Sequence, residues 1–146
     1  MSTIKWSILI STVGERHERF EWLMSLLMPQ VDKYKGQIEV VALWDNFHYT
    51  IGEARQMLLK DAKGEYVCFV DDDDEVPSYY CDEVFPLLDG VDYIGWQMQL
   101  YHNGVKMKPT YHSLRYDRWH EDESGYYRNL SHLNHIKREI ALKGDF

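Results

Sequence analysis

Residues 66–77 read Tyr66-Val67-Cys68-Phe69-Val70-Asp71-Asp72-Asp73-Asp74-Glu75-Val76-Pro77. The first five carry no charge, which predicts a strand that is buried on both faces. Five carboxylates follow at once, and adjacent anions repel one another unless something positive lies among them. Magnesium, manganese and calcium are hard cations that prefer oxygen ligands. In an open sheet covered by helices, ligands bind at the carboxyl ends of the strands, so we expect a divalent cation there.

The backbone of the acidic run decides which carboxylates act together. If it stays extended, Asp71 and Asp73 point to one side and Asp72 and Asp74 to the other. One such pair can hold a metal and a phosphate-bearing ligand. Two plainer interpretations compete with this one. A solvated acidic turn explains most charge runs, and a calcium loop would need Gly and Glu where Val76 and Asp82 stand.

Length, charge and cysteine content limit the class of protein. The 146 residues suit one domain with a substantial core. Residues 1–100 hold 8 basic against 18 acidic side chains, and residues 101–146 hold 8 against 6. The net charge of −8 argues against bulk binding of nucleic acid. Two cysteines give no disulfide framework, and neither a secretory signal nor a membrane span is present, so we expect a cytoplasmic protein.

Strands and helices alternate over the first ninety residues. Apolar runs predict strands over 6–10, 38–43 and 66–70. Helical spacing predicts helices over 16–29, ending near Pro29, over 52–62, and from Pro77 to about Leu88. This alternation is typical of a three-layer α/β domain with a mainly parallel sheet.

The pattern changes after residue 92. We expect a strand over 93–101, a hairpin turn at His102-Asn103-Gly104, and a return strand over 105–108. Residues 110–130 lack periodicity and suit a loop that lines a site. A last helix is expected after Asn134, which can cap it.

Three segments resemble the glycosyltransferases of family 2, which have the GT-A fold. Residues 7–12 resemble the opening strand of the family, with Thr12 kept. Residues 38–46 resemble its second strand and Asp-Asp pair, in which Trp44 replaces the first Asp and Asp45 keeps the second. The stretch 52–74 resembles the helix that leads into the metal-binding Asp-x-Asp (DXD) motif, and it is the most specific of the three.

The resemblance implies a single GT-A domain over 1–146. Residues 1–100 would bind metal and nucleotide sugar, and residues 101–146 would form a short antiparallel acceptor side. It implies an inverting, metal-dependent, hexosyl-type transferase that uses Mn²⁺ or Mg²⁺. The expected donor is a nucleotide diphosphate sugar, with UDP as the expected nucleotide. Asp73 and Asp71 would ligate the metal, with His132 or His135 completing its shell or binding phosphate. The nucleotide-sugar pocket would contain Thr12, Asp45, Arg55, Asp71 and Asp72.

The acceptor and the catalytic base are less defined. Inverting enzymes of the family use an acidic base that deprotonates the acceptor hydroxyl. Glu121-Asp122 is the only Glu-Asp pair after the acidic run, and we expect it to supply that base unless the base lies beyond this chain. A non-catalytic nucleotide-sugar-binding module, or a domain that only hydrolyses the donor, is the alternative. A sugar nucleotidyltransferase is disfavoured, because that class needs a Gly-rich phosphate loop after the first strand and residues 11–16 hold only one Gly. The acceptor and an assembly of identical subunits stay open.

Overall fold

A computed structural model describes residues 3–144. Its strands are β1 (Trp6–Thr12), β2 (Ile38–Trp44), β3 (Tyr66–Phe69), β4 (Tyr93–Ile94), β5 (Gln97–His102), β6 (Val105–His112), β7 (His120–Glu121), β8 (Tyr126–Arg128) and β9 (His135–Lys137). Its α-helices are α1 (His17–Asp32), α2 (Ile51–Asp61), α3 (Tyr80–Val84) and α4 (Arg138–Ala141), and two 3₁₀ turns are η1 (Gly14–Arg16) and η2 (Phe85–Leu87). Among these described residues, no helix combines the length and the apolar character that crossing a membrane requires.

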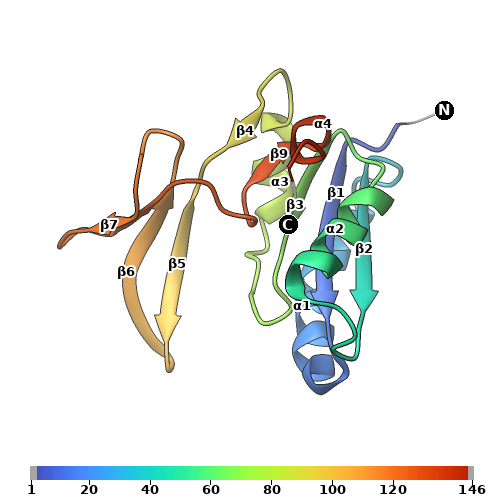
Figure 1. Cartoon of the computed structure of the whole chain (residues 1–146), viewed down its shortest axis with the longest axis horizontal. Coiled ribbons are helices and arrows are strands. Elements are labelled where there is room, and N and C mark those ends of the chain that lie inside the picture. The colour runs from blue at the N-terminus through green and yellow to red at the C-terminus, as the bar shows by residue number, and fades with distance from the viewer. Residues whose placement is uncertain (1–2, 145–146) are drawn as a thin grey trace.

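The larger sheet has the strand order β2-β1-β3-β9-β4 (Figure 1). Its first three strands are parallel, with Trp6 opposite both Ile38 and Tyr66. Strands β9 and β4 add two antiparallel pairings at the other edge. The carboxyl ends of β1, β2 and β3 therefore meet at one edge, as the alternation of strands and helices predicts.

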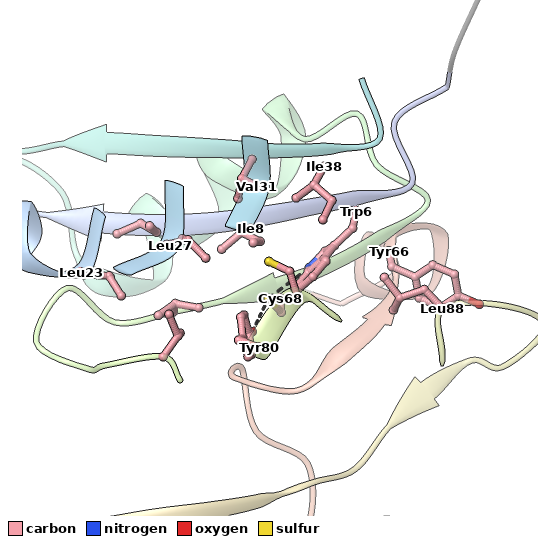
Figure 2. Packing of buried hydrophobic residues seen from close by; sticks show 14 residues of the cluster. Trp6, Ile8, Leu23, Leu27, Val31, Ile38, Tyr66, Cys68, Tyr80 and Leu88 are labelled. Carbon is pink, nitrogen blue, oxygen red and sulfur yellow. Dashed lines mark hydrogen bonds between the residues drawn. The ribbon is translucent and has the colours of Figure 1, made fainter. Parts of the chain in front are cut away.

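Helices cover both faces of this sheet. Trp6, Ile8 and Ile10 point to the face covered by α1 and α3 (Figure 2). Leu9, between them in β1, points to the opposite face and packs with Leu58 of α2. This alternation along one strand divides the core into two layers, which confirms the expected three-layer α/β fold.

The smaller sheet has the strand order β5-β6-β8-β7. Its β5–β6 hairpin turns at Asn103 and Gly104, which have φ of 49° and 77°, as the Asn-Gly pair predicts. The expectation of an irregular segment over 110–130 is wrong in part, because β6 extends to His112 and β7 and β8 lie within that range. Strand β8 pairs with β6, and β7 pairs with β8, so pairing orders short strands that have no periodic signal of their own.

Two predicted boundaries are wrong because tertiary packing overrides a local signal. Helix α1 continues through Pro29 to Asp32, since the buried stripe of Leu23, Leu27 and Val31 extends past the proline. A proline in the last turn forfeits one backbone hydrogen bond, which this burial offsets. The helix expected from Pro77 begins only at Tyr80 and is short, because the chain tightens to a 3₁₀ turn that contains a second proline.

Two other expected elements in the second half of the chain differ from the structure. The strand expected over 93–101 is split at Gly95, where an added Cβ would lie 2.3 Å from the His112 carbonyl oxygen. Asn134 does not cap a helix: its side chain accepts a hydrogen bond from Tyr93, and β9 follows before α4 begins. Residues 135–141 thus return to the larger sheet, whereas the sequence grouped them with an acceptor side.

His135 is a core residue. Its side chain is fully buried and lies edge-on to Trp6 at 4.8 Å between ring centres. Burial lowers its pKa from 6.5 to about 3. The expectation that His135 joins the metal shell is therefore wrong. Strand β9, which pairs with β3 and β4, places the His135 side chain in the core.

This burial predicts an acid-sensitive fold. Between the folded pKa of about 3 and the ordinary value of 6.5, the unfolded chain binds a proton at His135 and the folded chain does not. The free energy of unfolding should therefore decrease as the pH falls below the ordinary value, by about 2 kcal/mol at a pH near 5. Urea unfolding at neutral and mildly acidic pH should show a smaller loss in His135→Met than in the parent chain. The exposed His102→Met serves as control, and an equal pH response in all three proteins would contradict this assignment.

Candidate active site

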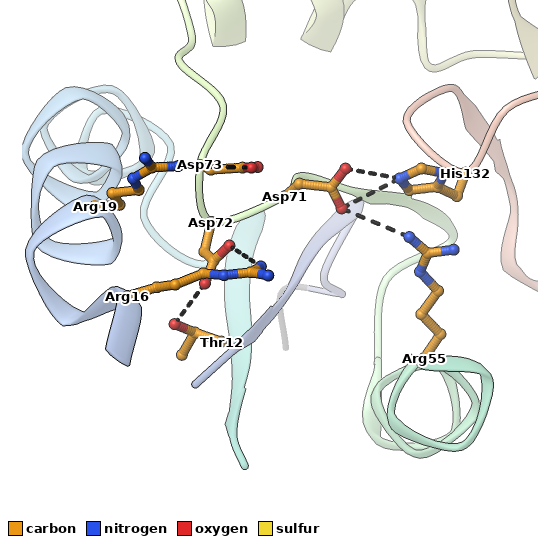
Figure 3. A network of polar contacts seen from close by, with 8 residues as sticks. All are labelled: Thr12, Arg16, Arg19, Arg55, Asp71, Asp72, Asp73 and His132. Atoms are coloured by element: carbon orange, nitrogen blue, oxygen red, sulfur yellow. Dashed lines mark hydrogen bonds and ion pairs between the residues drawn. The ribbon is translucent and has the colours of Figure 1, made fainter. Parts of the chain in front are cut away.

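Polar side chains from three parallel strands gather where those strands end. The Asp45 backbone N–H donates to the Thr12 carbonyl at 2.9 Å, which joins the end of β2 to the end of β1. Thr12 Oγ1 in turn donates to Asp72 Oδ2 at 2.9 Å, just beyond β3 (Figure 3). Thr12, Asp45 and Asp72 are all buried. The structure thus brings together three residues that the sequence assigned to one pocket.

The acidic run forms a turn. The Asp74 N–H donates to the Asp71 carbonyl at 3.0 Å, so the chain reverses over residues 71–74. The expectation of an extended backbone is therefore wrong. Asp71, Asp73 and Asp74 each offer a carboxylate oxygen within 4.8 Å of the others, and Asp72 points into the protein instead. We call these three residues the acidic cluster.

Asp71 is held by two side chains from distant parts of the sequence. His132 Nε2 lies 3.1 Å from Asp71 Oδ2, and an Arg55 guanidinium nitrogen lies 3.6 Å from Asp71 Oδ1 (Figure 3). Burial alone would raise the pKa of Asp71, but the hydrogen bond and charge of His132 and the charge of Arg55 lower it overall. Asp71 is therefore an anion in a fixed orientation.

Asp74 shows that the acidic cluster carries excess negative charge. Burial first, then repulsion from Asp71 and Asp73, raises the pKa of Asp74 to about 6. Arg19 approaches Asp73 only to 3.9 Å and is largely exposed. Three carboxylates close together with too little compensating charge form an oxygen donor set that fits Mg²⁺ or Mn²⁺. Asp74, which is not among the metal ligands expected from the sequence, belongs to this set.

Arg16 is a site residue that sequence reasoning missed. Its guanidinium lies 3.1 Å from Asp72 Oδ1 and compensates a buried carboxylate. The available signal was its position four residues after Thr12, where the loop that follows the first strand leads into a helix. Such loops meet the end of the neighbouring strand in a parallel sheet.

Asp45 uses both carboxylate oxygens locally. They accept hydrogen bonds from the backbone N–H groups of His48 at 2.9 Å and Tyr49 at 3.2 Å. This fixes the loop after β2, in which Phe47 has a φ of 64°. Trp44 at the end of β2 and Phe47 and Tyr49 in this loop have exposed aromatic side chains. Asp45 thus stabilises the loop after β2, and a contact with a nucleotide would be a second role for this residue.

The sequence of this chain matches a known family over most of its length. Residues 29–141 match the family described as Glycosyl transferase family 2. The chain belongs to this family. The matched range includes both β3 and the acidic cluster, which confirms the resemblance of the sequence to these glycosyltransferases. A search of curated proteins found no significant match.

Solved structures support the fold of this family 2 chain. It is similar to residues 1–349 of TarS from S. aureus, with a TM-score of 0.58 and 16% identity over 96% of this chain. It is also similar to the same protein in complex with UDP-GlcNAc, with a TM-score of 0.57 and 16% identity over 96% of this chain. The alignments cover 49% and 47% of those chains, so this chain spans about half the length of these neighbours.

Glu121 and Asp122 lie apart from the acidic cluster. Strand β7, which ends at Glu121, forms the far edge of the smaller sheet, on the side away from β3 (Figure 1). Glu121 pairs with Lys108 at 2.9 Å, and Asp122 Oδ1 accepts the backbone N–H of Ser124 at 2.8 Å. The structure does not bring this pair to the other predicted site residues of the family 2 domain.

A cleft separates the acidic segment from the smaller sheet. Its volume is about 980 Å³, and residues 73–77 line one wall while residues 97–101 of β5 line the other. Aromatic side chains lie in both walls: Tyr79 beside the acidic segment, and Trp96 and Tyr101 at the two ends of β5. Asp73 and Asp74 belong both to this cleft and to the acidic cluster. Two ligands bound to the cluster and to the cleft would therefore be neighbours.

Proposed function

We propose that this family 2 domain transfers a hexosyl-type sugar, with inversion, from a nucleotide diphosphate sugar to an acceptor hydroxyl. The acidic cluster at the end of β3, beside the ends of β1 and β2, carries the proposal. A UDP-linked donor is favoured because the TarS neighbour was solved in complex with UDP-GlcNAc. Clefts at the carboxyl ends of parallel strands are where open α/β sheets bind such ligands.

Asp71, Asp73 and Asp74 would hold the divalent cation, Mn²⁺ or Mg²⁺. When bound, such a cation neutralises the charge that develops on the departing diphosphate. His132 and Arg55 orient Asp71 from the side away from Asp73 (Figure 3). Thr12 and Arg16 keep Asp72 folded inward, so that the turn presents its remaining carboxylates together. We assign His132 to positioning Asp71, with metal ligation as its further predicted role.

A second candidate function is donor binding with slow hydrolysis and no efficient transfer. The position of Glu121 and Asp122 favours this function, because the pair lies far from the acidic cluster (Figure 1). It therefore does not supply a base for an acceptor that is bound beside the cluster. Efficient transfer needs both reactants held in line, which is worth up to roughly 7–11 kcal/mol of barrier.

Release of UDP tests both functions. The chain should be incubated with UDP-GlcNAc or UDP-glucose and Mn²⁺, and free UDP should be measured with and without added acceptors. We expect metal-dependent release that is slow without an acceptor. Acceptor-stimulated release would establish the transferase, and its absence in every acceptor mixture would favour the hydrolytic function. No release with any donor would leave only a binding module.

Asp45→Ala should weaken UDP binding whether or not metal is present. Asp45 follows β2 beside Thr12 and is not a member of the acidic cluster, which is the position expected to read the base. One lost charge-assisted hydrogen bond corresponds to about 1.5–3 kcal/mol, or at least a tenfold change in affinity. Calorimetric titration with UDP and with uridine measures this directly. A loss seen only with Mn²⁺ would instead place Asp45 at the phosphates. Asp45→Asn, which keeps an acceptor for the His48 and Tyr49 amides, controls for disorder of the loop.

A further inference from the structure

Strand β5 is an open edge that faces the cleft. It is the first strand of the smaller sheet and pairs only with β6 among the described strands. Figure 1 shows its other side turned toward the segment that follows β3. Residues 97–101 line the cleft from that side.

The register of the hairpin shows which backbone groups face the cleft. The His112 N–H donates to the Trp96 carbonyl at 3.0 Å, so residues 96 and 112 form a hydrogen-bonded pair. Antiparallel pairs alternate, and the next pair, Gln97 with Tyr111, is therefore non-hydrogen-bonded. Gln99 faces Pro109, which has no N–H to donate, in agreement with this alternation. The N–H and C=O groups of Gln97 and Gln99 consequently point away from β6, toward the cleft.

The open edge of β5 lacks the charged residues that usually prevent an edge strand from pairing with other chains. Natural proteins protect open edges with lysine, proline or strongly bent strands, because an exposed edge pairs with other chains. Residues 97–101 read Gln-Met-Gln-Leu-Tyr and hold no charge and no proline. A bulge between Gln99 and Tyr101 interrupts the register only at the hairpin end. The edge is instead protected by its place in a cleft, which admits a single strand more readily than a second sheet.

The opposite wall defines the charge of what enters. It contains Asp73, Asp74 and Glu75. The nearby arginines already form ion pairs with the acidic run: Arg16 with Asp72, Arg19 with Asp73 and Arg55 with Asp71. The acidic cluster and Glu75 carry four carboxylates, so one divalent cation bound to the cluster leaves net negative charge at this wall. Basic side chains would compensate that charge, whereas a second copy of this chain would bring residues 1–100 with their 18 acidic against 8 basic side chains. The backbone pattern of the edge and the charge of the wall together specify an extended, basic polypeptide.

We propose that an extended polypeptide with basic side chains adds a strand to β5 in this cleft. Its backbone pairs with Gln97 and Gln99, and its Lys or Arg side chains face the acidic wall. If the proposed transferase function holds, this polypeptide is the acceptor, because Asp73 and Asp74 are shared by the cleft and the acidic cluster. A Ser or Thr oxygen then bonds to the anomeric carbon of the UDP-sugar. The bond from that carbon to the diphosphate oxygen breaks, UDP leaves with the electron pair, and the hydroxyl proton passes to water.

The test uses a fluorescent heptapeptide, Lys-Val-Lys-Thr-Lys-Val-Lys, and the same peptide with every backbone nitrogen methylated. Fluorescence anisotropy should detect binding of the first peptide and at least about tenfold weaker binding of the second, since methylation removes several hydrogen bonds and keeps the charge. Equal binding of both peptides would show attraction by charge alone and would overturn the proposal. Absence of binding, or displacement by chitoheptaose with no peptide preference, would overturn it too.

Two variants of the chain make the test specific to the edge. Gln99→Pro removes an N–H that faces the cleft and makes no bond to β6, whereas Gln99→Ala removes only the side chain and its bonds to the Leu100 and Met107 carbonyls. We expect about tenfold weaker peptide binding in Gln99→Pro and little change in Gln99→Ala. Circular dichroism checks that both fold, and the methylated peptide decides the question if Gln99→Pro does not. UDP release without binding of the peptide would refute only this inference. Peptide binding without UDP release would refute the transferase and leave strand addition standing.

Discussion

Replacing Asp73 by Asn is expected to abolish the metal-dependent part of UDP binding while the fold stays intact. Asp73 is the exposed member of the acidic cluster, and among residues 3–144 its carboxylate forms an ion pair with Arg19 alone, at 3.9 Å. The fold should therefore lose little when its charge is removed. A divalent cation with two charged ligands in place of three loses one of its strongest contacts, since neutral amide oxygens bind hard cations more weakly. Calorimetric titration of UDP with and without Mn²⁺ measures the effect.

Glu75→Gln is the matched control for this variant. It removes the same charge from the same acidic run, but Glu75 lies outside the acidic cluster and accepts a hydrogen bond from Trp22 Nε1 at 3.0 Å. Its metal-dependent binding should remain close to that of the parent chain. Equal losses in both variants would show that Mn²⁺ responds to the overall charge of the segment and not to three specific ligands.

The largest expected effect on stability comes from Trp6→Ala. Trp6 is fully buried, its ring lies 5.5 Å from that of Tyr80, and its Nε1 donates to Cys68 Sγ at 3.4 Å. Removing a buried aromatic side chain leaves a cavity and costs about 3–5 kcal/mol. Since domains are stable by about 5–15 kcal/mol, the variant should lie near the threshold of unfolding.

Chemical denaturation of Trp6→Ala beside Trp22→Ala checks this prediction. Trp22 is 55% exposed, so its loss should change the free energy of unfolding by about 0.5 kcal/mol or less. A similar cost for the two variants would contradict the position of Trp6 at the centre of the core.

The order of elements could be predicted because the first three strands are short and mostly apolar, and β1 and β3 are buried on both faces. Tyr66 to Phe69, for example, are all buried, so no alternation blurs the signal. The later strands could not be placed in the same way. His135 belongs to a three-residue strand whose existence depends on its antiparallel partners Tyr93–Ile94, which are distant in sequence. Contacts of that kind carry no local pattern.

The site was predictable in composition and less so in geometry. The carboxyl ends of adjacent parallel strands must meet, which is why Thr12, Asp45 and the acidic run lie together. The alternation assumed for the acidic run failed because a turn, closed by the Asp74 N–H, replaces an extended chain. The sequence also placed Asp72 among the ligands of a donor, whereas Thr12 and Arg16 use its two oxygens.

Calorimetric titration of the unmodified chain with UDP, in Mn²⁺ and in EDTA, tests the central claim most directly. If Asp71, Asp73 and Asp74 form a cation site beside a nucleotide pocket, UDP should bind at least about tenfold more tightly with Mn²⁺, which corresponds to about 1.4 kcal/mol. Mn²⁺ should likewise bind more tightly when UDP is present, because the coupling between two ligands is reciprocal. UDP binding of equal strength in Mn²⁺ and EDTA, or no binding in either, would contradict the claim.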